Sequence, residues 1–410
     1  MKQLMGISVL AVVGLLGSVS LRAEMSEPVI QLVQSVPLET DLAQPGIPLT
    51  ADVWLEMIKN AKSTLDLAQF YVSSNSKWDP HIASKMAKQM GKKSPLEPLI
   101  DEIEKAGKRG VKCRLLVSET LISEDPQTLI RLKSMKGVNV RIFDLTKLTE
   151  EVHHAKYWIV DGKEVFVGSQ NFDWRSLTQI HELGVRVGDS DLARQLTRLF
   201  ESDWKIAKTQ QLPPENLPPF LSPVPYYSKR VELVASPQVL NPPEVRPAIG
   251  ALLELIQSAK RTLHIQLLDY SPVFGTTTQV YWPDLDDAIR GAALRGVKVQ
   301  MVLSHGRTTL KAMDYLKSLA MIPGIEIKTV TLPQFSGGEI PYARVIHSKY
   351  MVVDDESFWI GNSNWSKGYF YNSRNVELII RKPDIAKTGN AIFQKIWASS
   401  YSEKIDSAKK

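Results

Sequence analysis

Cysteine is almost absent from this sequence. Cys113 is the only one in 410 residues, so no disulfide can form within the chain. The sequence also lacks H-E-x-x-H, C-x-x-C, G-x-G-x-x-G and P-loop patterns, which argues against the metalloprotease, dithiol, dinucleotide and nucleotide-triphosphate chemistries that use them. Charge of one sign is not dominant, because 50 basic residues face 44 acidic ones. The net charge of +6 is compatible with an anionic substrate and does not identify one.

Long apolar runs are missing except at the N-terminus. Lys2 precedes an apolar run over residues 4–16, and small residues follow it. This order predicts a secretory signal peptide over residues 1–23, with an uncleaved membrane anchor as the alternative. The only N-x-S/T sequon, at Asn364, falls inside a motif described below. Together with the missing disulfides, these features predict a periplasmic or secreted protein.

After residue 23 the chain repeats one pattern twice. An apolar strand over residues 65–71 follows an amphipathic helix, and residues 263–268 repeat this arrangement. The next helix closes with Arg-Gly-Val-Lys in both copies. Alternating strand and helix patterns predict an α/β fold, and the hairpins expected around the motifs make the sheets mixed. We therefore predict two tandem α-β-α sandwich repeats that face each other.

A proline-rich stretch separates the two copies. It indicates a linker, because proline continues neither a helix nor a central strand. The predicted organisation is a signal peptide at 1–23, a first repeat at 24–211, a linker at 212–227 and a second repeat at 228–410.

Each copy carries the pattern H-x-K-x4-D, followed seven residues after the Asp by G-x-x-N. The residues after each lysine are apolar and β-prone, so each motif is expected to begin a strand. Alternate residues of a strand share a face, so the histidine and lysine of each motif project together. An Asp-Gly turn and a return strand bring the polar G-x-x-N residues back beside them. The expected substrate-binding residues are Ser169, Asn171, Asn362 and Asn364.

Two imidazoles and two ammonium groups at one site suit a phosphodiester. One histidine can attack phosphorus and form a phosphohistidine, while the other protonates the leaving oxygen. The lysines and amides can hold the non-bridging oxygens, so no metal or other cofactor is required. The predicted catalytic residues are His154, Lys156, Asp161, Glu182, His347, Lys349, Asp354 and Glu377.

Four carboxylates belong to this set for different reasons. Glu182 and Glu377 follow the two motifs and are expected to orient the histidines, as in a catalytic triad. Asp161 and Asp354 occupy turn positions, which favours a structural role over contact with phosphate.

Other side chains near the motifs have competing interpretations. Asn362 stands where the first copy has Ser169, so equal roles are not expected. His153 should face away from His154 and fill the core or surface. The aromatic residues within 365–371 either stack bases or pack beneath the site. The lysine-rich stretch at 85–93 is interpreted as a solvated charge run rather than a grip on a polyanion.

The doubled motif resembles the signature of the phospholipase D superfamily, H-x-K-x4-D-x6-G-S-x-N, and implies a phospholipase D-type pseudodimer. The match looks closer to the phospholipase D3 and D4 branch at residues 171–179, 282–287, 340–345 and 361–366. That resemblance implies 5′-to-3′ exonuclease activity on single-stranded nucleic acid, or phospholipid transfer. The chain departs from the branch in lacking its several cysteines. It also keeps Asp354 and Glu377, where the branch has a degenerate second motif.

Three functions remain open. The leading hypothesis is an exported, metal-independent phosphodiesterase acting on single-stranded DNA or RNA, which needs a basic track with aromatic platforms. The alternative is a phospholipase D or transphosphatidylase acting on phospholipids, which needs an apolar rim. A non-catalytic binding protein on the same fold is disfavoured by the intact motifs. No protein partner is inferred. Resemblance to bacterial phospholipases D favours His154 as the nucleophile and His347 as the acid.

Overall fold

The computed structural model describes residues 28–74, 94–212, 230–275 and 277–405. The expected signal peptide, the lysine-rich stretch and the linker beyond Leu212 lie outside these ranges. No helix within them is long and apolar enough to cross a membrane.

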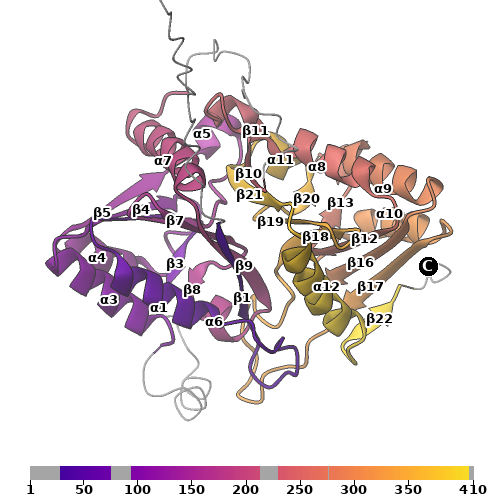
Figure 1. Ribbon diagram of the computed structural model, residues 1–410, viewed down its shortest axis with the longest axis horizontal. Helices are drawn as coiled ribbons and strands as arrows, with labels where there is room; N and C mark the ends of the chain where they lie inside the picture. The colour runs from indigo at the N-terminus through magenta and orange to yellow at the C-terminus, as the bar shows by residue number, and fades with distance from the viewer. Residues whose placement is uncertain (1–27, 75–93, 213–229, 276, 406–410) are drawn as a thin grey trace, which may run out of the picture.

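Each half of the chain builds one mixed sheet (Figure 1). The first sheet has the order β1 (Val29–Ser35), β9 (Glu182–Gly188), β7 (Glu164–Gly168), β6 (Tyr157–Val160), β2 (Thr64–Gln69), β4 (Lys112–Ser118), β5 (Val138–Phe143). The second has the order β11 (Arg246–Pro247), β10 (Val231–Ser236), β21 (Asn375–Ile380), β19 (Ser357–Gly361), β18 (Lys349–Val353), β12 (Thr262–Leu267), β16 (Lys298–Ser304), β17 (Ile325–Val330), β22 (Ser402–Lys404). In both sheets parallel strands continue into antiparallel hairpins, which confirms the predicted mixed character.

Helices cover both faces of each sheet. In the first half they are α1 (Thr50–Asn60), α3 (Glu97–Lys108), α4 (Pro126–Ser134), α5 (Thr146–Thr149), α6 (Trp174–Thr178) and α7 (Ser190–Thr209). In the second half they are the 3-10 turn η2 (Gln238–Leu240), α8 (Ala248–Ser258), α9 (Asp284–Leu294), α10 (Leu310–Ala320), α11 (Lys367–Tyr371) and α12 (Pro383–Trp397). Short strands pair as β3 (Val72–Ser73) with β8 (Phe172–Asp173), β13 (Tyr270–Ser271) with β20 (Trp365–Ser366), and β14 (Val273–Phe274) with β15 (Val280–Tyr281).

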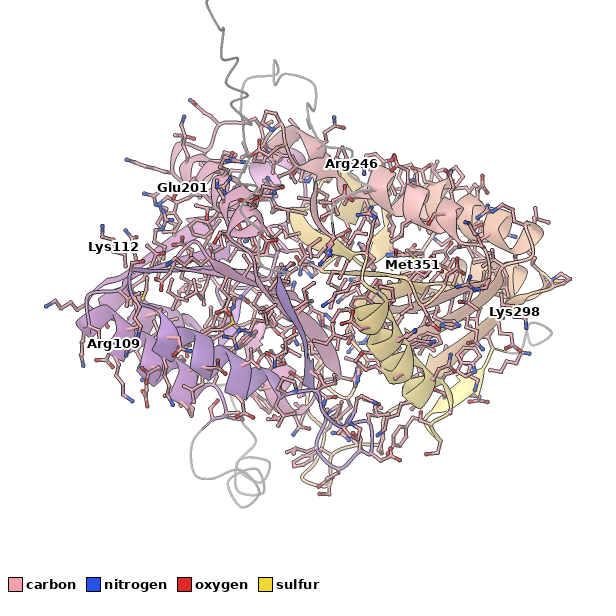
Figure 2. All side chains as sticks on the ribbon, viewed as in Figure 1. Arg109, Lys112, Glu201, Arg246, Lys298 and Met351 are labelled. Carbon is pink, nitrogen blue, oxygen red and sulfur yellow. The ribbon has the colours of Figure 1, made fainter. Side chains whose placement is uncertain are left out.

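The two halves share one hydrophobic core. Apolar residues of α7 and α12 belong to a single buried cluster that spans both sheets, whereas the outer helices of each half have clusters of their own. Across the junction, β7 of the first sheet lies against β19 and β21 of the second. Figure 2 shows Met351 inside the second half, with Arg109 and Lys112 projecting at the edge of the first. The halves are therefore packed as one body.

A buried ion pair crosses the junction. The guanidinium of Arg374, just before β21, donates from Nη2 to Asp203 on α7 at 2.9 Å, and both side chains are fully buried. Arg374 Nη1 also donates to the Ser236 carbonyl and to Asn241 Oδ1 at 3.0 and 2.7 Å. Burial raises the pKa of Asp203 to about 6, although Arg374 opposes this shift. Since ions are costly to bury, this pair depends on both partners being present.

Removing one partner of this pair should destabilise the protein strongly. We expect Arg374→Met to lower the free energy of unfolding by about 3 to 5 kcal/mol, because it leaves the Asp203 carboxylate buried and uncompensated. Urea unfolding measures this loss. The double variant Arg374→Met, Asp203→Leu should lose less than Arg374→Met alone, and a larger loss in the double variant would contradict the interpretation.

Candidate active site

His154 lies at the junction in the extended segment that leads into β6. The structure begins β6 at Tyr157, slightly later than the sequence predicted, because the His154 backbone N–H donates across the junction to the Arg374 carbonyl at 3.0 Å. Its ring Nδ1 lies 3.0 Å from Asn375 Oδ1. The Asn375 amide nitrogen donates to the Tyr369 carbonyl at 2.8 Å, which turns the amide oxygen toward the ring. His154 Nδ1 therefore carries the proton, and Nε2 is left with its lone pair.

His347 is held in the mirrored way by the first repeat. Its backbone N–H donates to the His181 carbonyl at 2.8 Å, and ring Nδ1 donates to Glu182 Oε2 at 2.8 Å. Glu182 is fully buried and accepts a second bond from Ser176 at 3.0 Å. Burial lowers the pKa of His347 to about 4, against the opposing charge of Glu182. Burial opposes ionisation of Glu182 too, yet His347 and Lys349 hold the pKa of this carboxyl below its ordinary value.

The partners of the histidines correct the sequence prediction. Glu182 was expected to act with its own motif, but it orients the histidine of the other repeat. Glu377 was expected to orient a histidine and does not, because its Oε2 accepts a bond from Trp359 Nε1 at 2.8 Å. In the strand register, Asn375 stands opposite Ser236 just as Glu182 stands opposite Ser35. Asn375 is thus the counterpart of Glu182, and equal spacing from the two motif histidines could have revealed it.

Both motif lysines are buried between the histidines. Lys156 Nζ donates to the His154 carbonyl at 2.7 Å, while Lys349 Nζ has no hydrogen-bond partner among the described residues. Burial lowers the pKa of Lys156 well below its ordinary value, and burial lowers that of Lys349 to about 8 despite Glu182 and Asp269. After burial, the charges of the two lysines and then His347 lower the pKa of His154. These couplings place all four motif side chains in one site.

The predicted amide and hydroxyl ligands divide into two groups. Asn171 and Asn364 are buried, and each has a side-chain oxygen that no described residue hydrogen-bonds, so they remain candidates to bind substrate. Ser169 instead bonds both backbone groups of Leu183 at 3.2 Å. Asn362 accepts from Val376 N at 3.0 Å and donates to the Gly168 carbonyl at 2.5 Å. Both side chains hydrogen-bond the backbone here, and contact of Ser169 and Asn362 with phosphate stays a prediction.

The motif aspartates cap backbone away from the histidines. Asp161 accepts from the N–H groups of Lys62, Ser63 and Thr64 at 2.7–2.9 Å. Asp354 accepts from the equivalent three N–H groups after α8 at 2.7–2.8 Å. Both sit at turns with positive φ, 52° and 55°. These contacts agree with the structural role that the turn chemistry favoured. They hold the start of β2 after α1 and the start of β12 after α8.

Aromatic rings surround His154. Phe70 and Tyr369 lie 4.8 and 5.0 Å from its ring, centroid to centroid, and Phe70 also faces Lys156 Nζ at 5.0 Å. Of the other aromatic residues predicted nearby, Trp365 and Phe370 are buried in the core and Tyr371 is exposed. The cluster is therefore mainly packing. His153 is fully buried, as a core role requires.

One titratable residue of the site was missed from sequence. Asp269 follows β12 at the position that Tyr71 occupies after β2, and it carries no motif signal. One of its carboxylate oxygens is buried and has no hydrogen-bond partner in the part of the chain that the structure describes. Burial raises its pKa to about 6, with Lys349 and Arg307 opposing the shift. Among the described residues, no group of three His, Cys, Asp or Glu side chains is arranged to hold a metal ion.

Two mixed sheets facing each other, with two histidine-lysine pairs between them, define a two-repeat α/β enzyme acting on phosphodiesters. A family model described as cardiolipin synthase, PLD-like domain, matches residues 54–204 and 252–397. The chain belongs to the phospholipase D superfamily and is a phosphodiester hydrolase.

Several relatives are known. The 5′-3′ exonuclease PLD3 of Macaca fascicularis is 33% identical over 386 residues, covering 88% of this chain and 76% of the relative. A probable phospholipase D of Caenorhabditis elegans is 29% identical over 382 residues, covering 86% and 67%. Phosphatidylserine synthase of Haemophilus influenzae shares the fold, with a TM-score of 0.58 at 12% identity, covering 87% of this chain and 85% of its own.

Replacing the amide beside His154 by a carboxylate should change its protonation. We expect Asn375→Asp to raise the pKa of His154 by about 1 to 3, because an adjacent anion stabilises the imidazolium. Titration of the ring by nitrogen NMR measures this pKa. Glu182→Gln is the matched variant, since it removes the carboxylate beside His347 and should lower the pKa of that ring. An unchanged His154 pKa in Asn375→Asp would contradict the assignment of Asn375.

Glu377 offers a test through stability. Burial raises its folded-state pKa to about 7, above the ordinary value of 4.5. Its stabilising contribution is therefore complete below pH 4.5 and is lost as pH rises through 7. Glu377→Gln cannot ionise, so we expect its stability relative to wild type to increase by about 3 kcal/mol between pH 4.5 and 8. Urea unfolding at several pH values checks this; a difference that does not vary with pH would refute it.

Proposed function

We propose that this chain is an exported, metal-independent 5′-3′ exonuclease that degrades single-stranded DNA or RNA through a phosphohistidine intermediate. The observation that carries this proposal is the crossed pairing of the histidines, in which Nδ1 of one ring meets Glu182 and Nδ1 of the other meets Asn375. Each pairing directs Nε2 to the substrate. The 5′-3′ direction and the nucleic acid are taken from the name of the relatives that cover most of the chain.

The two partners give the histidines different tasks. An amide oxygen accepts a hydrogen bond from His154 without adding charge, so this ring stays neutral and its Nε2 is available to attack phosphorus. A carboxylate stabilises the imidazolium form of His347, which suits a proton donor. A bound phosphodiester would add a negative charge and so oppose the lowering of the His347 pKa by burial. His154 is thus the nucleophile and His347 the general acid.

The reaction balances in two steps. In the first, a bond forms between His154 Nε2 and phosphorus, the bond from phosphorus to the leaving 5′-oxygen breaks, and His347 gives its proton to that oxygen. In the second, His347 takes a proton from water, whose oxygen attacks phosphorus and releases His154. Lys156, Lys349, Asn171 and Asn364 are the groups available to the non-bridging oxygens, on which charge accumulates in the transition state.

The proposal is tested on purified protein in EDTA. Single-stranded DNA with a 5′-hydroxyl and, separately, phosphatidylcholine with ethanol are incubated with wild type and with His154→Ala. We expect stepwise release of nucleotides by wild type, reduced by at least about 10³-fold in the variant, because the nucleophile is gone.

Phosphatidylethanol formed without nucleotide release would contradict the nuclease proposal and assign the phospholipid substrate instead. Activity that depends on added metal would contradict the proposed metal independence. Tyr371→Ala serves as control, because Tyr371 is exposed and its hydroxyl bonds Asp284 outside the site. Export is tested separately. The whole sequence is expressed, and the protein recovered outside the cytoplasm is analysed by N-terminal sequencing.

A further inference from the structure

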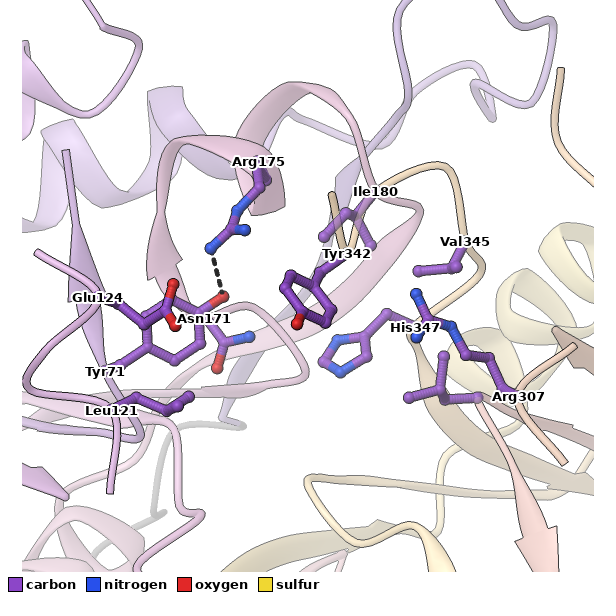
Figure 3. Close-up of a pocket in the computed structure, with 11 residues that line it drawn as sticks. Tyr71, Leu121, Glu124, Asn171, Arg175, Ile180, Arg307, Tyr342, Val345 and His347 are labelled. Carbon is purple, nitrogen blue, oxygen red and sulfur yellow. Dashed lines mark hydrogen bonds between the residues drawn. The ribbon is translucent and has the colours of Figure 1, made fainter. Parts of the chain in front are cut away.

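A pocket opens beside His347 and is lined by both repeats (Figure 3). It has a volume of about 320 Å³, and Tyr71, Asn171 and Arg175 line it from the first repeat. Arg307, Tyr342 and His347 line it from the second. His154 does not line it, so the pocket lies on the side of the proton donor. The volume is in the range of small-ligand sites.

The backbone of Tyr342 is in an unusual conformation. Its φ is 60°, in the left-handed region that a residue with a bulky side chain rarely adopts. Such a conformation costs free energy and persists only where the surroundings impose it, which is common at ligand sites. Here Arg175 Nη1 donates to the Pro341 carbonyl at 3.2 Å, and Arg344 N donates to the Gln179 carbonyl at 3.0 Å. The first repeat therefore fixes this loop of the second on both sides of Tyr342.

Packing does not explain the exposed ring. Ile340, Ala343 and Val345 are buried in the core of the first repeat, which anchors the loop. The Tyr342 side chain itself is 71% exposed, and no aromatic ring of the described residues packs against it. Figure 3 shows the ring beside the His347 imidazole, turned toward the pocket. A strained loop thus presents one unused aromatic face next to the proton donor.

The charges around the pocket favour an anion over a choline-like cation. Arg175 is buried and paired with Asp173, whereas Arg307 is exposed at the mouth near His347. Glu124 is the one carboxylate lining the pocket, at the end away from His347 in Figure 3. The exposed guanidinium of Arg307 would repel a quaternary ammonium group, whereas the charge of Arg175 is compensated by Asp173. A nucleoside followed by a phosphate matches an aromatic face followed by an arginine.

We propose that Tyr342 is the stacking platform for the base of the leaving strand, and that Arg307 contacts the phosphate after it. This inference rests on the proposed exonuclease function. There, the oxygen protonated by His347 belongs to the second nucleoside from the 5′ end, so this nucleoside enters the pocket beside His347. The exposed residues at the mouth leave room for the rest of the strand to continue into solvent.

The experiment combines a variant with a modified substrate. Oligonucleotides with an abasic analogue at the first, second or third position from the 5′ end are compared with the intact sequence. For wild type, the analogue at the second position should lower kcat/KM for the first cleavage about tenfold, since one stacked base is lost. Tyr342→Ala should lower kcat/KM on the intact strand by a similar factor and be insensitive to that analogue. Tyr342→Phe should behave as wild type.

Three controls separate the outcomes. Turnover of bis(p-nitrophenyl) phosphate reports the chemistry of the site without a nucleic acid, and His154→Ala should abolish it. Tyr342→Gly relieves the positive φ, so it should unfold at no lower urea concentration than wild type while losing the same activity on DNA. Arg307→Gln should weaken the salt dependence of KM on DNA.

Two results would contradict base stacking on Tyr342 and leave the proposed exonuclease activity intact. In one, Tyr342→Ala degrades DNA as wild type does. In the other, the analogue at the second position lowers kcat/KM of wild type and of Tyr342→Ala by the same factor, or only the analogue at the first position lowers kcat/KM. A wild-type protein that turns over the small diester but releases no nucleotide from DNA would overturn the proposed function, and the platform with it.

Discussion

Each motif histidine of this enzyme takes its orientation from the opposite repeat. His347 depends on Glu182 for its side chain and on His181 for its backbone, and His154 depends likewise on Asn375 and Arg374. Neither repeat can therefore position its own histidine. The buried ion pair, the shared core and the amide of Asn362 all serve this one requirement, because a small shift of one sheet against the other would break both pairings.

The backbone of the two repeats is nearly equivalent at the site, but the side chains are not. Glu182 corresponds to Asn375, and Ser169 to Asn362. The symmetric backbone places two rings at matched positions, and these rings meet unequal partners, an amide at His154 and a carboxylate at His347. Two histidines that share the H-x-K-x4-D motif thus differ in their hydrogen-bond partners, which lie in the opposite repeat.

The sequence predicts what depends on short-range pattern. Strand periodicity, the Asp-Gly turn after β6 and the repeated motif were sufficient for the two mixed sheets and for the histidine-lysine pairs. Contacts between residues that are more than 150 positions apart depend on how the repeats pack, so the crossing of Glu182 to His347 was not foreseen. Glu377 was chosen by residue type, whereas the register of β21 selects Asn375. The positive φ of Tyr342 has no local sequence signal, since neither glycine nor asparagine marks it.

The site brings together more buried basic side chains than nearby carboxylates. Lys349 has no hydrogen-bond partner among the described residues, and burial disfavours the charged form of both lysines and of His347. Glu182 and Asp269 are the nearby carboxylates that oppose this effect on Lys349. A phosphodiester brings the missing negative charge, so its binding and the protonation of the lysines and His347 must favour each other. A neutral ester or amide would bring no such charge. The excess of buried basic side chains therefore favours an anionic phosphodiester over a neutral ester or amide.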